Sequence, residues 1–133
     1  MLKLTLVTPE KKLVIDQEID FVSLPGFKGE LNILPGHSPL LTTVEPGVVK
    51  FKTKAGETVQ AAVGVGYCQV FTDGVNIMVE TAETAKEIDA QRSQKALEEV
   101  NKALATQTLN DQDYKDALSK RARAQARLSI IQK

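Results

Sequence analysis

The first 82 residues of the chain show the alternation of apolar and polar positions that is typical of β-strands. Leu2, Leu4 and Leu6 alternate with Lys3 and Thr5, which predicts a half-buried strand. After a polar break, the apolar runs that predict further strands are residues 13–24, 48–52, 58–63, 67–72 and 75–80. Many short strands separated by turn residues predict an all-β sandwich or flattened barrel.

Turn residues separate these predicted strands. Ala55-Gly56 predicts one hairpin turn, and Asp73-Gly74, which is flanked by apolar runs, predicts another. Gly64-Val65-Gly66 is interpreted as a place where two backbones approach closely, and not as a phosphate-binding loop. Proline and glycine disrupt central strands, so residues 25–40 are expected to form one long connection. The residues behind this expectation are Pro25, Gly26, Gly29, Pro35, Gly36 and Pro39.

The pattern changes after residue 82, and residues 83–133 contain neither glycine nor proline. This predicts a second domain, an antiparallel α-helical hairpin that follows the β-domain of residues 1–82. Thr84 and Glu87 fit a capping box that opens the first helix. Apolar residues then recur near helical spacing at Ile88, Ala96, Leu97, Val100 and Leu104.

The polar residues Thr106-Gln107-Thr108 interrupt this helical pattern. Asn110 is suited to cap a second helix, and Asp111 and Asp113 are favourable near the positive end of its dipole. Joined by a short connection, the two helices are expected to pack against each other. The apolar face of the second helix consists of Ala117, Ala124, Leu128 and Ile131.

Two properties of the second helix bear on function. Alanine buries little area, so the hairpin is expected to dock on the β-domain with a gain of only a few kcal/mol before entropy is subtracted. Marginal docking is the physical condition for a movable element. Residues 115–133 also carry six basic residues and a single acid, Asp116. This excess of positive charge predicts either a solvated basic face or a helix that binds an acidic partner. The basic residues are Lys115, Lys120, Arg121, Arg123, Arg127 and Lys133.

Composition narrows the class of protein. Of 133 residues, 42% are hydrophobic and 26% charged, which is typical of a globular protein. The net charge is zero, so nothing in the overall charge favours nucleic acid as a partner. With two tyrosines, four phenylalanines and no tryptophan, the core must be mainly aliphatic. The single cysteine, Cys68, lies in a strand-like run and is expected to be a buried structural thiol.

The chain lacks the signals of a membrane or secreted protein. Residues 1–6 alternate and do not form the continuous apolar region of a signal peptide. No segment approaches the 18 or so apolar residues that a membrane-spanning helix needs. We therefore expect a cytosolic location, with any membrane association made through a partner.

One long motif resembles a known family. Gly29-Glu30 is followed by Ile33-Leu34-Pro35-Gly36-His37-Ser38-Pro39-Leu40-Leu41-Thr42. This motif closely resembles the pattern of the epsilon subunits of bacterial F-type ATP synthases. Further matching elements occur in the same order along the chain: Val7-Thr8-Pro9, Glu45-Pro46-Gly47, Glu80-Thr81-Ala82-Glu83 and Ile88-Asp89-Ala90-Gln91-Arg92.

The resemblance implies a non-catalytic subunit of the central stalk on the cytoplasmic face of the bacterial inner membrane. Its implied partners are the gamma subunit, the ring of membrane-embedded c subunits and the catalytic beta and alpha subunits. Gly29, Glu30 and His37 are the implied ring contacts. In the family, the helical hairpin extends toward the catalytic head and hinders ATP hydrolysis. The residues implied in this inhibitory contact are Lys120, Arg121, Arg123 and Arg127.

Some bacterial members of the family bind ATP on the folded hairpin. The resemblance implies no required cofactor, and it introduces ATP as a candidate regulatory ligand. Two features depart from the ATP-binding pattern, Ser93 where alanine is usual and Glu99 where an arginine occurs. Asp89 and Arg92, three residues apart, also fit a structural ion pair within the helix. The implied ATP-binding residues are Glu83, Ile88, Asp89, Arg92, Arg123 and Arg127.

The sequence leaves other functional classes to be weighed. A lone histidine, His37, suggests neither metal binding nor catalysis without partner ligands or a nucleophile, so it is assigned to an interface or to a loop hydrogen bond. The alternating Asp16, Glu18 and Asp20 look like solvated charges and not like the paired carboxylates of a hydrolase. An unrelated β-sandwich interaction module is an alternative, as is a coiled-coil dimerisation tail, although the alanine-rich second helix argues against the tail.

Overall fold

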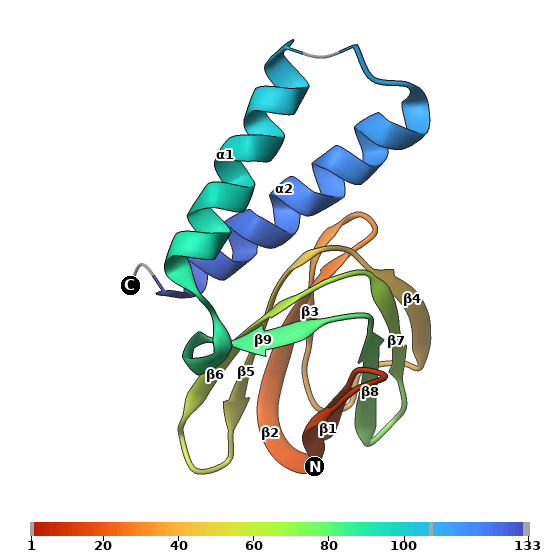
Figure 1. Cartoon of the computed structure of the whole chain (residues 1–133). Coiled ribbons are helices and arrows are strands. Elements are labelled where there is room, and N and C mark those ends of the chain that lie inside the picture. Colours follow the sequence, from red (N-terminus) through yellow and green to blue (C-terminus); the bar gives the residue numbers. More distant parts are fainter. Residues whose placement is uncertain (1, 107, 132–133) are drawn as a thin grey trace.

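The computed structural model describes residues 2–106 and 108–131. Gln107, within the expected polar interruption, and Lys133, counted among the basic residues, lie outside the described residues. Within them, a β-body is followed by a pair of helices that lies across it (Figure 1). The elements are β1 (Leu2–Val7), β2 (Lys12–Gly26), β3 (Gly29–Ile33), β4 (Leu40–Val44), β5 (Gly47–Thr53), β6 (Thr58–Val63), β7 (Gly66–Val70), β8 (Gly74–Val79), β9 (Ala82–Thr84), the short 3-10 helix η1 (Ala85–Glu87), α1 (Ala90–Thr106) and α2 (Asp111–Ile131).

The strands form a flattened, closed β-body. Their order is β1-β8-β7-β4-β2-β5-β6-β9, and β3 pairs with β2 outside this path. β1 pairs in parallel with β8 and antiparallel with β2, so the sheet returns on itself. This architecture confirms the predicted sandwich or flattened barrel, and the two helices after it confirm the predicted hairpin.

The long strand β2 connects the two layers because it changes partner along its length. It pairs first with β1, then with β5, and finally with β3 and β4. The register with β1 shifts where Asp16 takes a positive φ of 45°, and the Asp16 backbone N–H donates to Thr5 Oγ1 at 3.1 Å. A second shift in register with β5 occurs between Ile19 and Phe21. Such irregularities bend a strand and let it run from one layer into the other.

The expectation of one long connection over residues 25–40 is wrong in its extent. Pro25 and Gly26 end β2, and residues 29–33 return as β3, so a tight hairpin occupies the first part. Proline is tolerated here because β2 stops pairing with β5 at Ser23 and starts pairing with β4 at Gly26, so Pro25 lies between the two ladders. The Pro25 carbonyl accepts a hydrogen bond from Glu45 N–H at 2.8 Å. The true connection is residues 34–39. Three strands that the sequence did not predict are β3, β4 and β9.

Both predicted hairpins are present, with a difference in detail at the second. Gly56 has a φ of 94° in the β5–β6 turn, a conformation that favours glycine. At the β7–β8 turn, Phe71 N–H donates to Gly74 C=O at 2.7 Å, so Thr72 and Asp73 are the central residues. The Asp73-Gly74 pattern predicted that these two residues occupy the centre of the turn. In the structure Gly74 follows the two central residues and begins β8.

The core is aliphatic, as the composition required. Leu2, Leu4 and Leu6 are all essentially buried, which confirms the predicted inward face of the first strand. Cys68 is fully buried among the same side chains, and desolvation raises the pKa of its thiol to about 12. Its burial confirms the predicted buried thiol, and the raised pKa disfavours the reactive thiolate.

Helix starts differ from the prediction in the first helix and agree in the second. Thr84 and Glu87 interact as expected, since Glu87 Oε1 accepts from the Thr84 N–H at 3.2 Å, but they open η1 and not α1. The α1 helix begins after Asp89, whose carboxylate accepts from the Arg92 backbone N–H at 3.0 Å. Asn110 caps α2 as predicted, with its Oδ1 accepting from the Asp113 N–H at 2.7 Å.

The hairpin docks on the β-body through a small apolar cluster. Ala126 and Ile130 of α2 are buried against Ala62 of β6, and Val48, Ile88 and Ile131 are partly buried around them. By contrast, α1 buries only Ser93 and Val100, and the expected apolar position Ala96 is exposed. A contact made largely by alanine removes little apolar area from water, so it contributes little stability.

Candidate functional site

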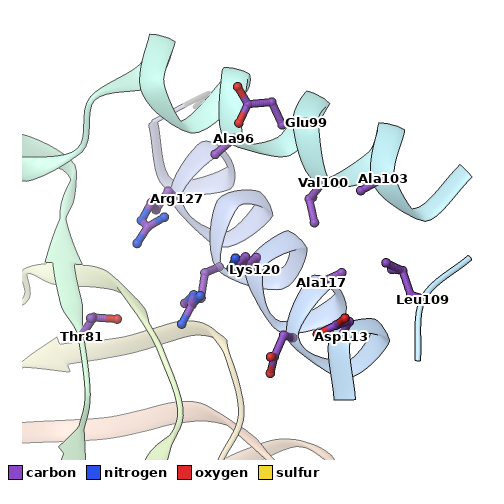
Figure 2. A pocket seen from close by; sticks show the side chains of 12 residues that line it. Thr81, Ala96, Glu99, Val100, Ala103, Leu109, Asp113, Ala117, Lys120 and Arg127 are labelled. Atoms are coloured by element: carbon purple, nitrogen blue, oxygen red, sulfur yellow. The ribbon is translucent and has the colours of Figure 1, made fainter. Parts of the chain in front are cut away.

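A groove runs between α1 and α2 and reaches the β-body at Thr81. Its volume is about 660 Å³. Arg127 projects from α2 into this space, on the side where Thr81 of the β-body lies (Figure 2). The lining carries three acidic and three basic side chains, so the groove has no strong net charge, and all of them except Glu99 lie on α2. The charged lining residues are Glu99, Asp113, Asp116, Lys120, Arg123 and Arg127.

An ion pair joins the hairpin to the β-body beside this groove. Arg127 Nε donates to Glu83 Oε1 at 2.7 Å, and the two side chains are only 25% and 28% exposed. Glu83 lies in β9 and Arg127 lies in the last turns of α2. Because the pair is largely shielded from water, its attraction is less screened than that of a surface pair.

Gly64 gives α2 room to approach the sheet. A Cβ atom at this position would lie 2.8 Å from Thr81 Oγ1 and 3.6 Å from Arg123 Cδ. The Arg123 side chain is therefore held against a part of the backbone that carries no side chain. Gly66 is more constrained, since a Cβ there would lie 2.0 Å from Met78 C=O, which confirms the predicted close approach of backbones.

The structure brings together only part of the residue set implied for ATP. Glu83 and Arg127 pair directly, and Arg123 lines the same groove. Ile88 instead packs in the small apolar cluster, and the Asp89 carboxylate caps α1. Arg92 is exposed, and no ion pair joins its side chain to Asp89 among the described residues.

The two positions that depart from the ATP-binding pattern lie in different surroundings. Ser93 is 4% exposed, so this small residue belongs to the packing of α1 and is not presented to a ligand. Glu99 lines the groove from α1, whereas the basic lining residues come from α2.

The basic residues implied in inhibition are partly engaged in the folded hairpin. Lys120 is exposed and Arg121 is half-buried. Arg123 and Arg127 are half-buried, the second of them in its pair with Glu83. Lys120 is therefore accessible in the folded hairpin, whereas Arg127 would be fully accessible only after its pair with Glu83 is broken.

The β2–β3 hairpin presents Gly29 and Glu30 at its tip. Gly29 has a φ of 111°, and a Cβ at Gly26 would lie 3.1 Å from Gly29 C=O, so glycine is favoured on both sides of the turn. Phe27 at the tip is 74% exposed. Glu30 is exposed too, and its Oε1 accepts a hydrogen bond from the buried Ser23 hydroxyl.

His37 lies apart from Glu30. It follows β3 at the end opposite to the hairpin tip, in a turn where its N–H donates to Leu34 C=O at 3.1 Å. Gly36 in this turn has a φ of 83°, as a type II turn requires. The His37 Nδ1 lies 2.7 Å from Ser38 C=O, an acceptor, so Nδ1 carries the proton. The structure therefore does not bring the three implied ring contacts together.

An exposed apolar face on β4, β7 and β8 was not predicted from the sequence. Tyr67 pairs with Met78 on one side and Thr43 on the other, so these three side chains point the same way. Leu41 shares this face and is 69% exposed, while Tyr67 is 59% and Met78 48% exposed. A hollow of about 620 Å³ lies beside Tyr67 and Met78. Buried Cys68 alternates with exposed Tyr67, so the strand period did contain this signal.

A second ion pair ties the start of the hairpin to the β1–β2 connection. Lys11 Nζ donates to Glu87 Oε2, and both side chains are partly exposed. The Lys11 hydrogen bond and then the Thr84 backbone N–H lower the pKa of the Glu87 carboxyl below its ordinary range. The pair is exposed to solvent, so its contribution to stability is small.

Over residues 2–106 and 108–131, no group of histidine, cysteine, aspartate and glutamate side chains is arranged to hold a metal ion. In the same described part of the chain, neither helix is long and apolar enough to cross a lipid bilayer.

Comparison with known proteins identifies the class. Residues 1–85 match the family model described as the ATP synthase delta/epsilon chain, beta-sandwich domain. A chain in the mitochondrial ATP synthase of Euglena gracilis, solved with OSCP, F1 and c-ring, has a TM-score of 0.73 at 23% identity, over 98% of this chain and 77% of that one. A chain of the central stalk and c-ring of the Tetrahymena thermophila mitochondrial ATP synthase has a TM-score of 0.64 at 20% identity, over 98% and 93% of the two chains. At these identities the two structures support the fold alone.

Curated relatives define the family more closely. The ATP synthase epsilon chain of Bdellovibrio bacteriovorus is 44% identical over 98% of this chain and 94% of its own length. The epsilon chain of Geobacter sulfurreducens is 39% identical over 99% and 94% of the two chains. The chain belongs to the family of ATP synthase epsilon chains.

Proposed function

We propose that this chain is a non-catalytic subunit of the central stalk of an F-type ATP synthase on the cytoplasmic face of a bacterial inner membrane. The β-body helps transmit rotation of the c-ring, and the helical hairpin regulates ATP hydrolysis. The full-length match to epsilon chains carries this proposal. A rigid body joined to a weakly docked hairpin is the physical arrangement that the two roles need.

The exposed apolar face of β4, β7 and β8 is the proposed contact with the gamma subunit. Large apolar side chains grouped on one face mark interaction surfaces, and aromatic residues and methionine are enriched in them. Leu41, Tyr67 and Met78 supply this chemistry on strands that are held by the rest of the sheet. The proposal predicts that Tyr67→Asp weakens binding to gamma more than ten-fold, while the chain remains folded.

The tip of the β2–β3 hairpin is the proposed contact with the polar loops of the c-ring. Gly29 and Glu30 lie there, beside the exposed Phe27. His37 lies at the other end of β3, one turn before β4. We therefore assign His37 to the side of the molecule that faces gamma, and place the ring contact on Gly29 and Glu30.

The inhibitory role is assigned to the basic side chains Lys120, Arg121, Arg123 and Arg127. In the folded hairpin, Arg127 pairs with Glu83 and Arg123 lies against Gly64. An acidic segment of the catalytic subunits would offer these arginines new partners of the same charge as Glu83. Since exposed ion pairs contribute about 0.2–1 kcal/mol each, exchange between the two positions needs only a small free-energy difference.

The experiment is reconstitution of the motor with a chain that ends at Ile88, which retains all nine strands and η1. Proton-driven ATP synthesis should be retained, and ATP hydrolysis should become faster or less latent. A full-length variant in which the four basic residues are changed to glutamine separates loss of charge from loss of the hairpin. Unchanged hydrolysis in both variants would remove the regulatory role and leave the coupling role.

ATP as a regulatory ligand is a second proposal. Glu83, Arg123 and Arg127 lie together beside one groove, and this grouping supports it. Titration calorimetry of the full chain with ATP tests it, with Arg127→Gln as the matched variant. Binding heat that disappears in Arg127→Gln would support the ligand, and absence of heat up to millimolar ATP would exclude it.

A further inference from the structure

We infer that Ser23 is a positioning residue, which holds the Glu30 carboxylate in the orientation that the c-ring meets. The inference rests on the proposed ring contact at the β2–β3 hairpin. Ser23 is 7% exposed and Glu30 is exposed, so only Glu30 is available to a partner. The Ser23 hydroxyl donates to Glu30 Oε1.

Strand register explains why Ser23 is the residue that reaches this carboxylate. Glu30 lies directly opposite Pro25, near the end of the β2–β3 ladder. Pro25 has neither an N–H nor a polar side chain, so it offers the carboxylate no donor. Ser23 is two residues earlier on β2, on the same face as Pro25, and is thus the diagonal neighbour of Glu30.

The same face supplies a positive charge at greater distance. Ser23 pairs with Lys50 of β5, so Lys50 also lies on this face, on the side away from β3. Ser23, Glu30, Lys50 and Gln60 line a hollow of about 380 Å³. Of these groups, Ser23 is the one that donates a hydrogen bond to Glu30 among the described residues.

Fixing one oxygen of Glu30 prepares the other for binding. A free glutamate side chain samples many rotamers, and ordering it at an interface reduces affinity. The ionised carboxylate only accepts hydrogen bonds, so the matching group on the ring must be a donor, such as a lysine, an arginine or a backbone N–H. Ser23 acts on this contact through Glu30 and does not touch the partner.

The test is a double-mutant cycle in the full chain bound to gamma, with purified c-ring in detergent as the probe. Ser23→Ala should weaken binding to the ring about three- to tenfold, the range expected from freeing one ordered side chain. Ser23→Thr, which keeps the hydroxyl, should restore most of the affinity. In a Glu30→Ala background, which lacks the acceptor of the Ser23 hydrogen bond, Ser23→Ala should have little further effect. Thermal unfolding and gamma binding of each variant serve as controls for folding.

The outcomes separate the inference from the function on which it rests. If Ser23→Ala weakens ring binding equally with and without the Glu30 carboxylate, the effect is general damage to β2, and the positioning role is wrong. If Glu30→Ala is defective while Ser23→Ala is normal, the ring contact stands and the inference alone is overturned. If Glu30→Ala binds the ring normally, the ring contact itself fails, and the inference fails with it.

Discussion

Close approach of backbones restricts single positions in the β-body, and Gly66 is the strongest case. An alanine there would place its Cβ atom 2.0 Å from Met78 C=O and 2.6 Å from Val79 Cα. Since neither neighbour is a flexible side-chain end, the strands would have to move apart. We expect Gly66→Ala to lower the free energy of unfolding by about 1–3 kcal/mol or more. Urea denaturation measures this.

Gly74 provides the matched control for that prediction. A Cβ at Gly74 would lie 3.5 Å from Lys3 C=O, an ordinary van der Waals contact. Gly74→Ala is therefore expected to change the free energy of unfolding by less than about 1 kcal/mol. Equal urea midpoints for Gly66→Ala and Gly74→Ala would contradict the account of the β7–β8 contact.

The Lys11–Glu87 pair makes a small part of stability depend on pH. The pKa of Glu87 is lower in the folded chain than in the unfolded chain, chiefly because of the Lys11 hydrogen bond. Its contribution is therefore fully present at neutral pH and is lost as the pH falls through the folded-state pKa. Glu87→Gln should be less stable than the parent at pH 7, by well under 1 kcal/mol because the pair is exposed, and the difference should vanish in acid.

Paired urea titrations of the parent and of Glu87→Gln at neutral and acidic pH check this dependence. A stability difference that grows as the pH falls would have the wrong sign for a carboxyl whose pKa is lowered by folding.

Single residues could be predicted from the sequence where a local pattern determines their role. The burial of Cys68 and the inward face of Leu2, Leu4 and Leu6 follow from period-2 alternation. The bond from Ser23 to Glu30 depends on the register of β3, a strand that the sequence did not predict. Long-range partners such as Lys11 and Glu87 have no local signal at all.

At the scale of elements, the docking of α2 depends on one shielded ion pair and a few small side chains. Removing the Glu83 charge leaves the half-buried Arg127 guanidinium without a neutralising carboxylate. We expect Glu83→Gln to weaken docking by about 1 kcal/mol, which corresponds to about a fivefold larger open population. Trypsin cleaves after lysine and arginine in an open helix, so its rate at Lys120 and Arg121 should rise by this factor.

Asp20→Asn is the control for the trypsin experiment. It removes the ion pair between Asp20 and Lys54, which spans 3.2 Å within the β-body and does not involve the hairpin. Trypsin should therefore cut α2 in Asp20→Asn at the parental rate. A rate unchanged in Glu83→Gln as well would show that the ion pair does not hold α2.

Element types were predictable where pattern and caps agree, and less so where glycine and proline intervene. Asn110 marks the start of α2 correctly, because its side chain satisfies a free N–H locally. The Thr84 capping box was also present, but Ile88 after it is extended, so only one turn of 3-10 helix forms before Asp89 starts α1. Residues 25–40 were assigned to a connection because proline and glycine disrupt central strands. In the structure, Pro25 lies near the end of β2, and Gly29 begins β3, a strand that pairs with β2 outside the main strand order.

At the scale of the whole molecule, two parts that bury apolar clusters of very different size share one chain. The β-body has a continuous aliphatic core, while the hairpin contacts it through a cluster centred on Ala62, Ala126 and Ile130. The sequence indicated this contrast through its alanine-rich second helix. Strand alternation marked Tyr67 as outward-facing, but the grouping of Tyr67 with Met78 on one face depends on which strands are neighbours, and the sequence did not indicate that.

Amide hydrogen exchange of the full chain tests the unequal stability of the two parts most directly. The account predicts that amides of α1 and α2 exchange through local opening at a much lower free energy than amides of the central strands β5 and β7. The strands should be protected up to the free energy of global unfolding. Equal protection of α2 and the strands would mean that the hairpin is as firmly held as the β-body, and would contradict the proposed regulatory movement.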